Sequence, residues 1–273
     1  MHGPDTDLSK VAPHPQVMGV LNVTPDSFSD GGRYLDPEAA VAHARALVAE
    51  GASVVDVGGE SSRPGAEPVD EAEELRRVVP VIEALAGEVR LSIDTVKPAV
   101  ARVAVAAGAT LVNDVSASPE VAQVAADGGA GYVVMHRKGT ARTMQDDPLY
   151  DDVVVEVKTF LAEQARRARD AGIEEIWVDP GIGFGKTAAH NLSLLRHLDE
   201  IVDLGYPVIV GTSRKAFLGR LLAESDGASE SVPTDDRLAG SLATATWAVA
   251  HGAAMIRAHD VRASVQAVKV VAA

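Results

Sequence analysis

The chain has 273 residues, 47% of them hydrophobic but only 4% aromatic, with no cysteine and a net charge of −14 at pH 7. The lack of cysteine excludes disulfides, thiolate nucleophiles and cysteine-based metal sites, and the acidic balance argues against a nucleic-acid-binding surface, which needs clustered Lys and Arg. No run reaches the roughly 18 apolar residues of a membrane span, and residues 1–15 contain no apolar signal segment. A soluble, cytoplasmic protein is therefore expected.

The chain begins with a polar, proline-containing segment, 1–15, which is expected to be a flexible tail. The remainder, 16–273, shows no linker and is expected to form one domain. Within it, short apolar runs alternate with stretches of helical character. The predicted strands cover about 17–21, 53–57, 90–93, 110–113, 131–135, 175–178, 207–210 and 254–257.

A repeated pattern supports these strands. A helical stretch ends in glycine, which favours the left-handed conformation that closes a helix. A short apolar run without alternation follows, as is typical of a parallel strand buried on both faces. The run then ends on a polar residue, five positions after the glycine, in three pairs: Gly51 and Asp56, Gly108 and Asn113, and Gly252 and Arg257. Eight such units predict a single-domain (β/α)₈ TIM barrel. An open doubly wound sheet is the alternative fold.

In such a barrel the active site lies at the carboxyl ends of the strands. Nearly every predicted strand of this chain ends on a group that can bind a polar substrate. One such residue alone would be explained as well by a turn or a helix cap, but most strand ends at once are not. The residues at these ends are Asn22, Asp56, Asp94, Asn113, Met135, His136, Asp179, Ser213, Lys215, Arg257 and His259.

Three loops add to this picture. Residues 21–32, LNVTPDSFSDGG, combine turn formers with one aromatic residue and suit a mobile lid. Residues 58–65, GGESSRPG, carry an Arg-Pro pair, and residues 211–219, GTSRKAFLG, place Arg214 and Lys215 where they suit an anion or a flat polar ring. The run GIGFGKT at 181–187 looks like a phosphate-binding loop, but Pro180 stands where that pattern needs glycine.

These motifs together resemble the dihydropteroate synthase family. The first three loops carry the resemblance, and SIDT (92–95), NDVS (113–116), MHRKGT (135–140), DPGIGFGKT (179–187) and RAHDV (257–261) extend it in the same order from about residue 16 to the C-terminus. Membership implies a transferase that joins a pterin diphosphate to 4-aminobenzoate in folate synthesis, is a sulfonamide target, uses Mg²⁺, and forms a homodimer.

The resemblance also implies roles for single residues. The pterin pocket would comprise Asp94, Asn113, Met135, Asp179, Phe184 and Lys215. The diphosphate would lie against Asn22, Ser62, Arg257 and His259, with Asn22 as the Mg²⁺ ligand. The aminobenzoate would be framed by Phe28, Arg63, Pro64, Ser213 and Lys215. The residues expected to act in catalysis are Lys215, Asp94, Asp179 and Arg257.

These roles are chemically reasonable. A carboxylate such as Asp179 accepts two parallel hydrogen bonds from an amidine-like pterin edge, as it does from arginine, and Asn113 offers both a donor and an acceptor. Two positions depart from the family pattern: Ser62 stands where threonine is common, and Arg137-Lys138 replace Met-Gln in the MHMQGT sequence.

Three alternatives stay open at this point. A barrel of the methyltetrahydrofolate methyltransferase type would share the pterin carboxylates but has no use for a diphosphate-binding Arg257 and His259. A catalytically silent pterin-binding homologue would keep the pocket without turnover. A Schiff-base aldolase would use Lys215 as its nucleophile.

Overall fold

Eight parallel strands and the helices that follow them make up the computed structural model, which describes residues 12, 14–24, 36–61, 68–140, 143–144 and 146–273. The strands are β1 (Gln16–Asn22), β2 (Val54–Gly58), β3 (Arg90–Asp94), β4 (Leu111–Asp114), β5 (Gly131–Met135), β6 (Ile176–Asp179), β7 (Ile209–Val210) and β8 (Met255–Ala258). Each lies within about two residues of its predicted position at either end, apart from the shorter β7. The sequence pattern therefore located all eight strands.

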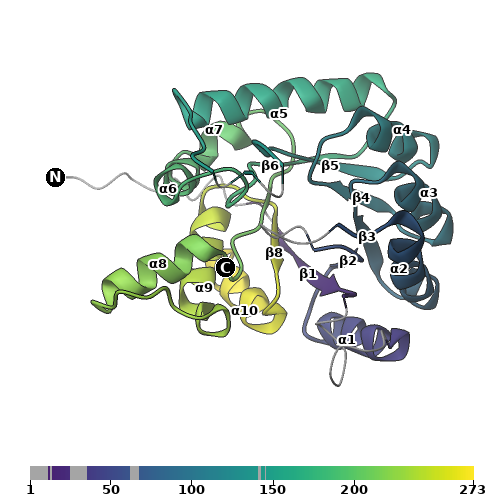
Figure 1. Ribbon diagram of the computed structural model, residues 1–273, viewed down its shortest axis with the longest axis horizontal. Coiled ribbons are helices and arrows are strands. Elements are labelled where there is room, and N and C mark those ends of the chain that lie inside the picture. Colours follow the sequence, from purple (N-terminus) through teal and green to yellow (C-terminus); the bar gives the residue numbers. More distant parts are fainter. Residues whose placement is uncertain (1–11, 13, 25–35, 62–67, 141–142, 145) are drawn as a thin grey trace.

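Helices follow the strands and lie outside them (Figure 1). They are α1 (Pro37–Ala49), α2 (Glu71–Leu85), α3 (Pro98–Ala107), α4 (Pro119–Asp127), α5 (Val153–Asp170), α6 (Ala188–Arg196), α7 (Leu198–Val202), α8 (Ala216–Ser225), α9 (Leu238–Ala250) and α10 (Val261–Val271), with a 3₁₀ turn at Thr234–Asp236. None of the helices in the described part of the chain is both long and apolar enough to cross a membrane.

The sheet closes into a barrel. Its strand order is β6-β5-β4-β3-β2-β1-β8-β7, with all neighbours parallel. The remaining gap between β6 and β7 is bridged at Val178 and Val208, where the Val178 amide donates to the Pro207 carbonyl at 3.0 Å. The (β/α)₈ barrel predicted from the sequence is therefore confirmed, and the open doubly wound sheet is wrong.

Local sequence explains where several helices begin and end. Asp36 accepts a hydrogen bond from the Glu38 amide at 2.9 Å, with Pro37 in the first helical position. At the start of α2, Asp70 accepts from the Glu73 amide at 2.8 Å. Gly108 ends α3 with a φ of +126°, a value that side chains rarely adopt.

The apolar core has two parts. A large one lies between the strands and the helices and includes Leu47, Ile82 and Leu161, all buried. A smaller one fills the barrel interior, and its members face inward from seven of the eight strands: Met18, Val54, Leu111, Val133, Trp177, Ile209 and Met255. This inner layer closes the barrel below the strand ends, so a ligand can enter only above it.

Outside the barrel, the connection after α8 is irregular: α8 continues to Ser225, and the backbone over 228–233 has no regular secondary structure. The tail over 1–15 lies outside the described residues except for Ala12 and 14–15, so its predicted flexibility stays a prediction.

Candidate active site at the barrel mouth

A layer of polar side chains lies directly above the apolar inner layer. Successive side chains of a strand point to opposite faces, so the residue two positions after an inner one also faces the barrel interior. This relation places the following residues at the mouth: Asp56 after Val54, Asn113 after Leu111, Met135 after Val133, Asp179 after Trp177 and Arg257 after Met255. Asp94 stands in the same relation to the buried Ser92 of β3.

These side chains line one pocket. Its walls comprise Asp94, Asn113, Val115, Met135, Asp179, Ile182, Phe184, Gly211, Lys215 and Arg257. All six residues predicted for a pterin pocket are among them, together with Arg257. The structure thus brings together residues from β3, β4, β5, β6 and β8 that are far apart in the sequence.

One half of the mouth is a network of paired charges. Arg257 donates from Nε to Asp56 Oδ2 at 2.6 Å and from Nη2 to Asp94 Oδ2 at 2.8 Å. Asn113 Nδ2 donates to the same Asp56 oxygen at 3.0 Å. Asp56 is fully buried, and its second oxygen, Oδ1, has no hydrogen-bond partner among the described residues. Arg257, predicted to face a diphosphate, is therefore held between two carboxylates.

Burial and neighbouring charges shift the pKa values of Asp94 and Arg257 in this half of the mouth. Burial raises the pKa of Asp94 to about 7, against the attraction of Arg257 and with added repulsion from Asp56. Burial also opposes the charge of Arg257, but Asp56 and Asp94 outweigh it and raise the pKa of the guanidinium. Arg257 is thus permanently charged, while Asp94 can take up a proton near neutral pH.

The other half of the mouth is built without a closed ion pair. Asp179 is 7% exposed and accepts one hydrogen bond, from the Gly181 amide at 2.7 Å. Among the described residues no cation lies within ion-pair distance of it, and burial raises its pKa despite the Gly181 bond and the attraction of Lys215. Burial likewise lowers the pKa of Lys215 to about 8. The Lys215 ammonium lies 3.9 Å from the centre of the Phe184 ring.

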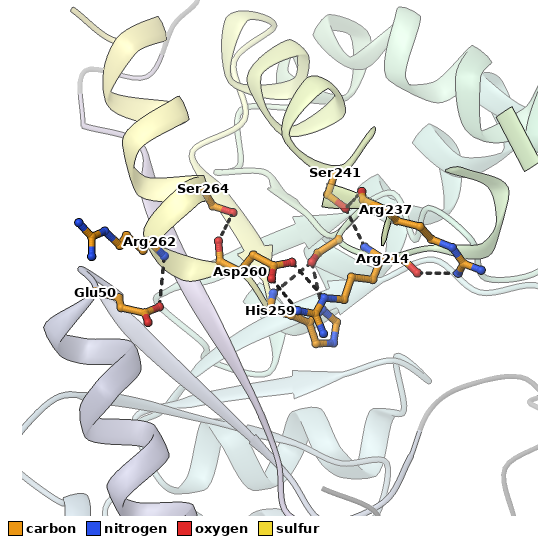
Figure 2. A network of polar contacts seen from close by, with 9 residues as sticks. Glu50, Arg214, Arg237, Ser241, His259, Asp260, Arg262 and Ser264 are labelled. Carbon is orange, nitrogen blue, oxygen red and sulfur yellow. Dashed lines mark hydrogen bonds and ion pairs between the residues drawn. The ribbon is translucent and has the colours of Figure 1, made fainter. Parts of the chain in front are cut away.

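The loop after β7 is fastened to the loop after β8 (Figure 2). Ser213 Oγ lies 3.0 Å from His259 Nδ1 and accepts from the His259 amide at 3.1 Å. The Arg214 guanidinium donates to both oxygens of Asp260, at 3.0 and 2.6 Å. The prediction that Arg214 suits an anionic or flat substrate is wrong on this geometry, because its fork is occupied by Asp260 and it does not line the pocket.

Arg214 also has an unusual backbone. Its φ is +59°, in the left-handed region that favours glycine. The conformation is held by a bond from its amide to Ser241 Oγ at 3.0 Å and by one from Arg237 to its carbonyl at 3.1 Å (Figure 2). These contacts set the direction in which the chain enters Lys215.

The remaining predicted residues fall into two groups. Asn22 ends β1, pairs with Gly58 of β2 and is partly buried at the mouth. Phe28, Ser62, Arg63 and Pro64 lie outside the described residues, so their predicted contacts with aminobenzoate and diphosphate stay predictions.

Lys138, the second of the two residues that depart from the family's MHMQGT sequence, has a defined position in the structure. Lys138 Nζ lies 4.2 Å from the centre of the Tyr150 ring and 3.2 Å from Glu156, and it also donates to the Leu149 carbonyl. Lys138 is therefore engaged in the loop before α5 and does not line the pocket.

The mouth offers few ligands for a metal. Across the described part of the chain, no three His, Asp or Glu side chains gather closely enough to hold an ion by themselves. The oxygens at hand are the Asn22 amide oxygen and the unpartnered Asp56 Oδ1. This set fits Mg²⁺, which takes few protein ligands and completes its shell with water and phosphate oxygens.

Two features of the site had not been predicted. Asp260 as the partner of Arg214 is one, and the other is Lys186, which is almost completely buried behind the pocket. The sequence contained a weak signal for each, since Asp260 directly follows the predicted His259 and Lys186 lies within the DPGIGFGKT motif.

Comparison with known proteins agrees with this site. A family model described as "Pterin binding enzyme" matches residues 18–259. The dihydropteroate synthase of Mycobacterium leprae is 51% identical over 94% of this chain and 93% of its own. Two structures of the Xanthomonas albilineans dihydropteroate synthase, with 4-aminobenzoic acid and with 7,8-dihydropteroate, are 48% and 46% identical, with TM-scores of 0.85 and 0.82 over 94% of this chain and 92% of theirs. The chain therefore belongs to the dihydropteroate synthases, a family of pterin-binding transferases.

Proposed function

We propose that this chain condenses (7,8-dihydropterin-6-yl)methyl diphosphate with 4-aminobenzoate, giving 7,8-dihydropteroate and diphosphate. The observation that carries the proposal is the pocket at the barrel mouth, in which the buried Asp179, with no cation at ion-pair distance among the described residues, lines the same cavity as Asn113, Phe184 and Lys215. A polar, flat heterocycle with donors along one edge suits such a pocket. Family membership agrees with this choice.

Pterin recognition would follow from the placement of the charges. Asp179 is expected to accept two hydrogen bonds from the amidine-like edge of the ring, replacing water that the ligand displaces. Asn113, anchored through its Nδ2 on Asp56, keeps its amide oxygen as an acceptor for an adjacent ring N–H. Lys215 would donate to ring acceptors, and Met135 would floor the pocket, where it is 3% exposed. Asp94 would meet the ring on the opposite side from Asp179.

The diphosphate would lie toward β1, β2 and β8, where Arg257 and His259 provide positive charge or donors. We expect Mg²⁺ to bind there with Asn22 as its protein ligand and Asp56 as a water-bridged neighbour. The ion, when bound, would neutralise charge on the departing diphosphate. Ser62 is expected to add a hydroxyl donor, but it lies outside the described residues.

The aminobenzoate would bind between the loops after β2 and β7. Of the residues predicted to frame it, Ser213 and Lys215 are described: Ser213 lies beside His259, and Lys215 lines the pocket. Sulfonamides have the shape of aminobenzoate, so they should compete for this place, and substitutions at Phe28, Ser62 or Pro64 should change their inhibition.

The chemistry is a substitution at the pterin methylene carbon. The bond from this carbon to the diphosphate oxygen breaks, the bond to the amino nitrogen of aminobenzoate forms, and the nitrogen releases a proton to water. The aniline nitrogen is neutral at pH 7, so no strong base is required, and the protein acts by orienting both substrates and stabilising charge. Lys215 has a binding role in this scheme and forms no Schiff base.

Release of diphosphate on addition of aminobenzoate to the protein with pterin diphosphate and Mg²⁺ tests the proposal. A pterin-binding methyltransferase or a silent homologue would give no release. Lys215 trapped covalently by borohydride with a carbonyl substrate would instead support the aldolase alternative. Excess chelator should abolish turnover, and unchanged turnover would contradict the magnesium site at Asn22.

Two further expectations rest on the family resemblance. We expect a homodimer, which sedimentation of the purified chain would test, and a cytoplasmic location, which fractionation of the producing cell would test. Trp247 and Leu238 of α9, each 41% exposed, are large apolar side chains that a second subunit would cover.

A further inference from the structure

Lys186 is a buried lysine without a carboxylate partner in the described part of the chain. It ends the turn that follows β6, and only 1% of its surface is exposed. Buried lysines are normally paired, because an isolated ammonium loses its hydration without compensation. Within the described residues no acidic side chain lies at ion-pair distance from Lys186. The groups that compensate for the burial of its charge therefore indicate the role of Lys186.

Backbone oxygens and one imidazole surround the Lys186 nitrogen. Its Nζ lies 2.9 Å from the Gly181 carbonyl, 3.0 Å from the Phe184 carbonyl, 3.3 Å from the His136 carbonyl and 2.9 Å from His136 Nδ1. Burial lowers the pKa of His136 to about 3, so its ring is neutral at pH 7 and Nδ1 can accept. Burial lowers the pKa of Lys186 itself to about 7, against the attraction of Asp179. In its protonated form the ammonium has three N–H donors for these four acceptors, which come from two separate loops.

The two loops are packed so tightly that only glycine fits between them. Gly181 has a φ of +66°, and a Cβ atom there would lie 1.8 Å from the His136 carbonyl oxygen. Gly185 has a φ of +63°, and a Cβ atom there would lie 2.2 Å from the Lys138 carbonyl oxygen. The close approach brings carbonyl oxygens of both loops around the Lys186 nitrogen, which donates to those of His136, Gly181 and Phe184.

Each of the contacted residues adjoins a wall of the pocket. His136 follows Met135 on β5, and Gly181 donates its amide to Asp179 at 2.7 Å. Phe184 places its ring 3.9 Å from the Lys215 ammonium. Lys186 itself does not line the pocket. Lys186 therefore acts on a ligand through these three neighbours and through the attraction of its charge for Asp179.

We infer that Lys186 is a positioning residue, an internal cation that fixes the β5 and β6 strand ends relative to each other and so sets the geometry of Asp179 and Phe184 in the pterin pocket. This role rests on the proposed function, since it concerns the same pocket. It explains why a lysine follows the glycine-rich turn even though the turn is no phosphate-binding loop: the ammonium binds protein carbonyls in place of a phosphate.

Calorimetric titration with (7,8-dihydropterin-6-yl)methyl diphosphate tests the role in Lys186→Met, which keeps the length of the side chain and removes the charge. Loss of charge-assisted bonds that hold the pocket wall should weaken binding by about tenfold or more. The matched control is Leu161→Ala, which opens a cavity in α5 outside the barrel and lowers stability without touching the pocket. Its dissociation constant should stay within about twofold of the wild type, as expected of distant sites.

A second variant keeps the test decisive if Lys186→Met does not fold. His136→Phe retains an aromatic ring against Phe160, whose ring centre lies 5.0 Å away, and removes both ring nitrogens, including the Nδ1 acceptor of Lys186. It should weaken pterin binding in the same direction but by less, about threefold. Wild-type affinity in the folded variants, or a loss equal to that of Leu161→Ala, would overturn the positioning role. Absence of binding to the wild-type protein would overturn the proposed function itself.

Discussion

The two halves of the barrel mouth differ in how their charges are satisfied. On the side of β2, β3 and β8, Asp56, Asp94 and Arg257 already bond one another before any ligand enters. On the side of β6 and β7, Asp179 and Lys215 form no direct ion pair with any described residue, although each is desolvated. In the paired half the charged groups bond one another within the protein. In the unpaired half Asp179 and Lys215 can still form hydrogen bonds to a ligand.

This difference indicates how a buried polar site can be stable without a ligand and still bind one. A buried charge without a partner costs free energy, and a ligand that supplies the missing bonds recovers it. The paired half is then expected to contribute mainly to the stability of the barrel and to the diphosphate side of the site. The unpaired half is expected to contribute mainly to affinity for the pterin. Substitutions in the two halves should therefore have different signatures.

The largest effect is expected from Asp179→Asn. The two side chains are nearly the same size, so packing should survive, but the new NH₂ group would face a donor of the pterin edge. Losing a charge-assisted hydrogen bond and leaving a donor unpaired together cost about 3–5 kcal/mol, which is on the order of 10²- to 10³-fold in pterin affinity. Calorimetry with pterin diphosphate measures it. A loss below about threefold would make Asp179 a turn residue.

Lys215→Ala should follow, with a loss of about ten- to a hundredfold in kcat/KM, as expected for the loss of one charge-assisted donor. The variant should stay folded, because Lys215 lies above the packed layers of the barrel. Steady-state kinetics together with circular dichroism would separate the two effects. A folded variant with wild-type rates would remove Lys215 from the site, and failure to fold would make it structural.

Asp56→Asn should mainly lower the stability of the fold and have a smaller effect on pterin affinity. Removing one charge of a buried network leaves Arg257 undercompensated, and such changes cost about 3 kcal/mol of folding free energy. Urea unfolding of the ligand-free protein measures this loss. Pterin affinity should fall less than in Asp179→Asn, because Asp56 bonds to protein groups and not to the ring. An undiminished stability with a greatly reduced pterin affinity would reverse the roles of the two halves.

A smaller effect is expected at the clamp between the loops after β7 and β8. Arg214→Gly removes the guanidinium that bonds Asp260 but tolerates the positive φ, whereas Arg214→Ala removes the same group and keeps the backbone strain. Both should raise the KM for aminobenzoate by about three- to tenfold, the worth of one misplaced hydrogen bond. Because the alanine variant keeps the backbone strain of the wild type and the glycine variant relieves it, the alanine variant should be the less stable of the two. Equal KM values in wild type and both variants would show that the clamp does not position Lys215.

The smallest effect concerns pH. The pKa of Asp94 is raised to about 7 in the folded protein, so between about pH 4 and 7 the native carboxyl group holds its proton more tightly than the unfolded chain does. Its stabilising contribution is present below about pH 4 and is lost as the pH rises through about 7. The stability of Asp94→Asn relative to the wild type should therefore be higher at pH 8 than at pH 5. A difference that does not change with pH would contradict the raised pKa.

Much of the site followed from the sequence because the relevant information is local and periodic. Each strand end could be found from a short apolar run after a glycine, and the alternation along strands then places residues such as Asn113 and Asp179 at one mouth. Five of the six residues of the pterin pocket were located at or just after strand ends in this way, and they line a common cavity for this reason. The resemblance added Phe184, the grouping of these residues into one pterin site and the identity of the ligand.

The contacts that could not be predicted depend on distances between loops. Nothing in the local sequence indicates that Arg257 reaches back 201 positions to Asp56, or that the fork of Arg214 is taken by Asp260. The burial of Lys186 also escaped prediction, because a lysine after a glycine-rich turn is normally solvated. In each case a long cation finds its partners only once the barrel has closed.

The most direct test of the difference between the two halves is a crystal structure of the protein with the pterin diphosphate bound. We expect the amino-pyrimidine edge of the ring within hydrogen-bonding distance of Asp179, with Arg257 still on Asp56 and the Phe184 ring still beside Lys215. A ring edge bound by Asp94 in place of Asp179, with Arg257 displaced from both carboxylates, would contradict the account.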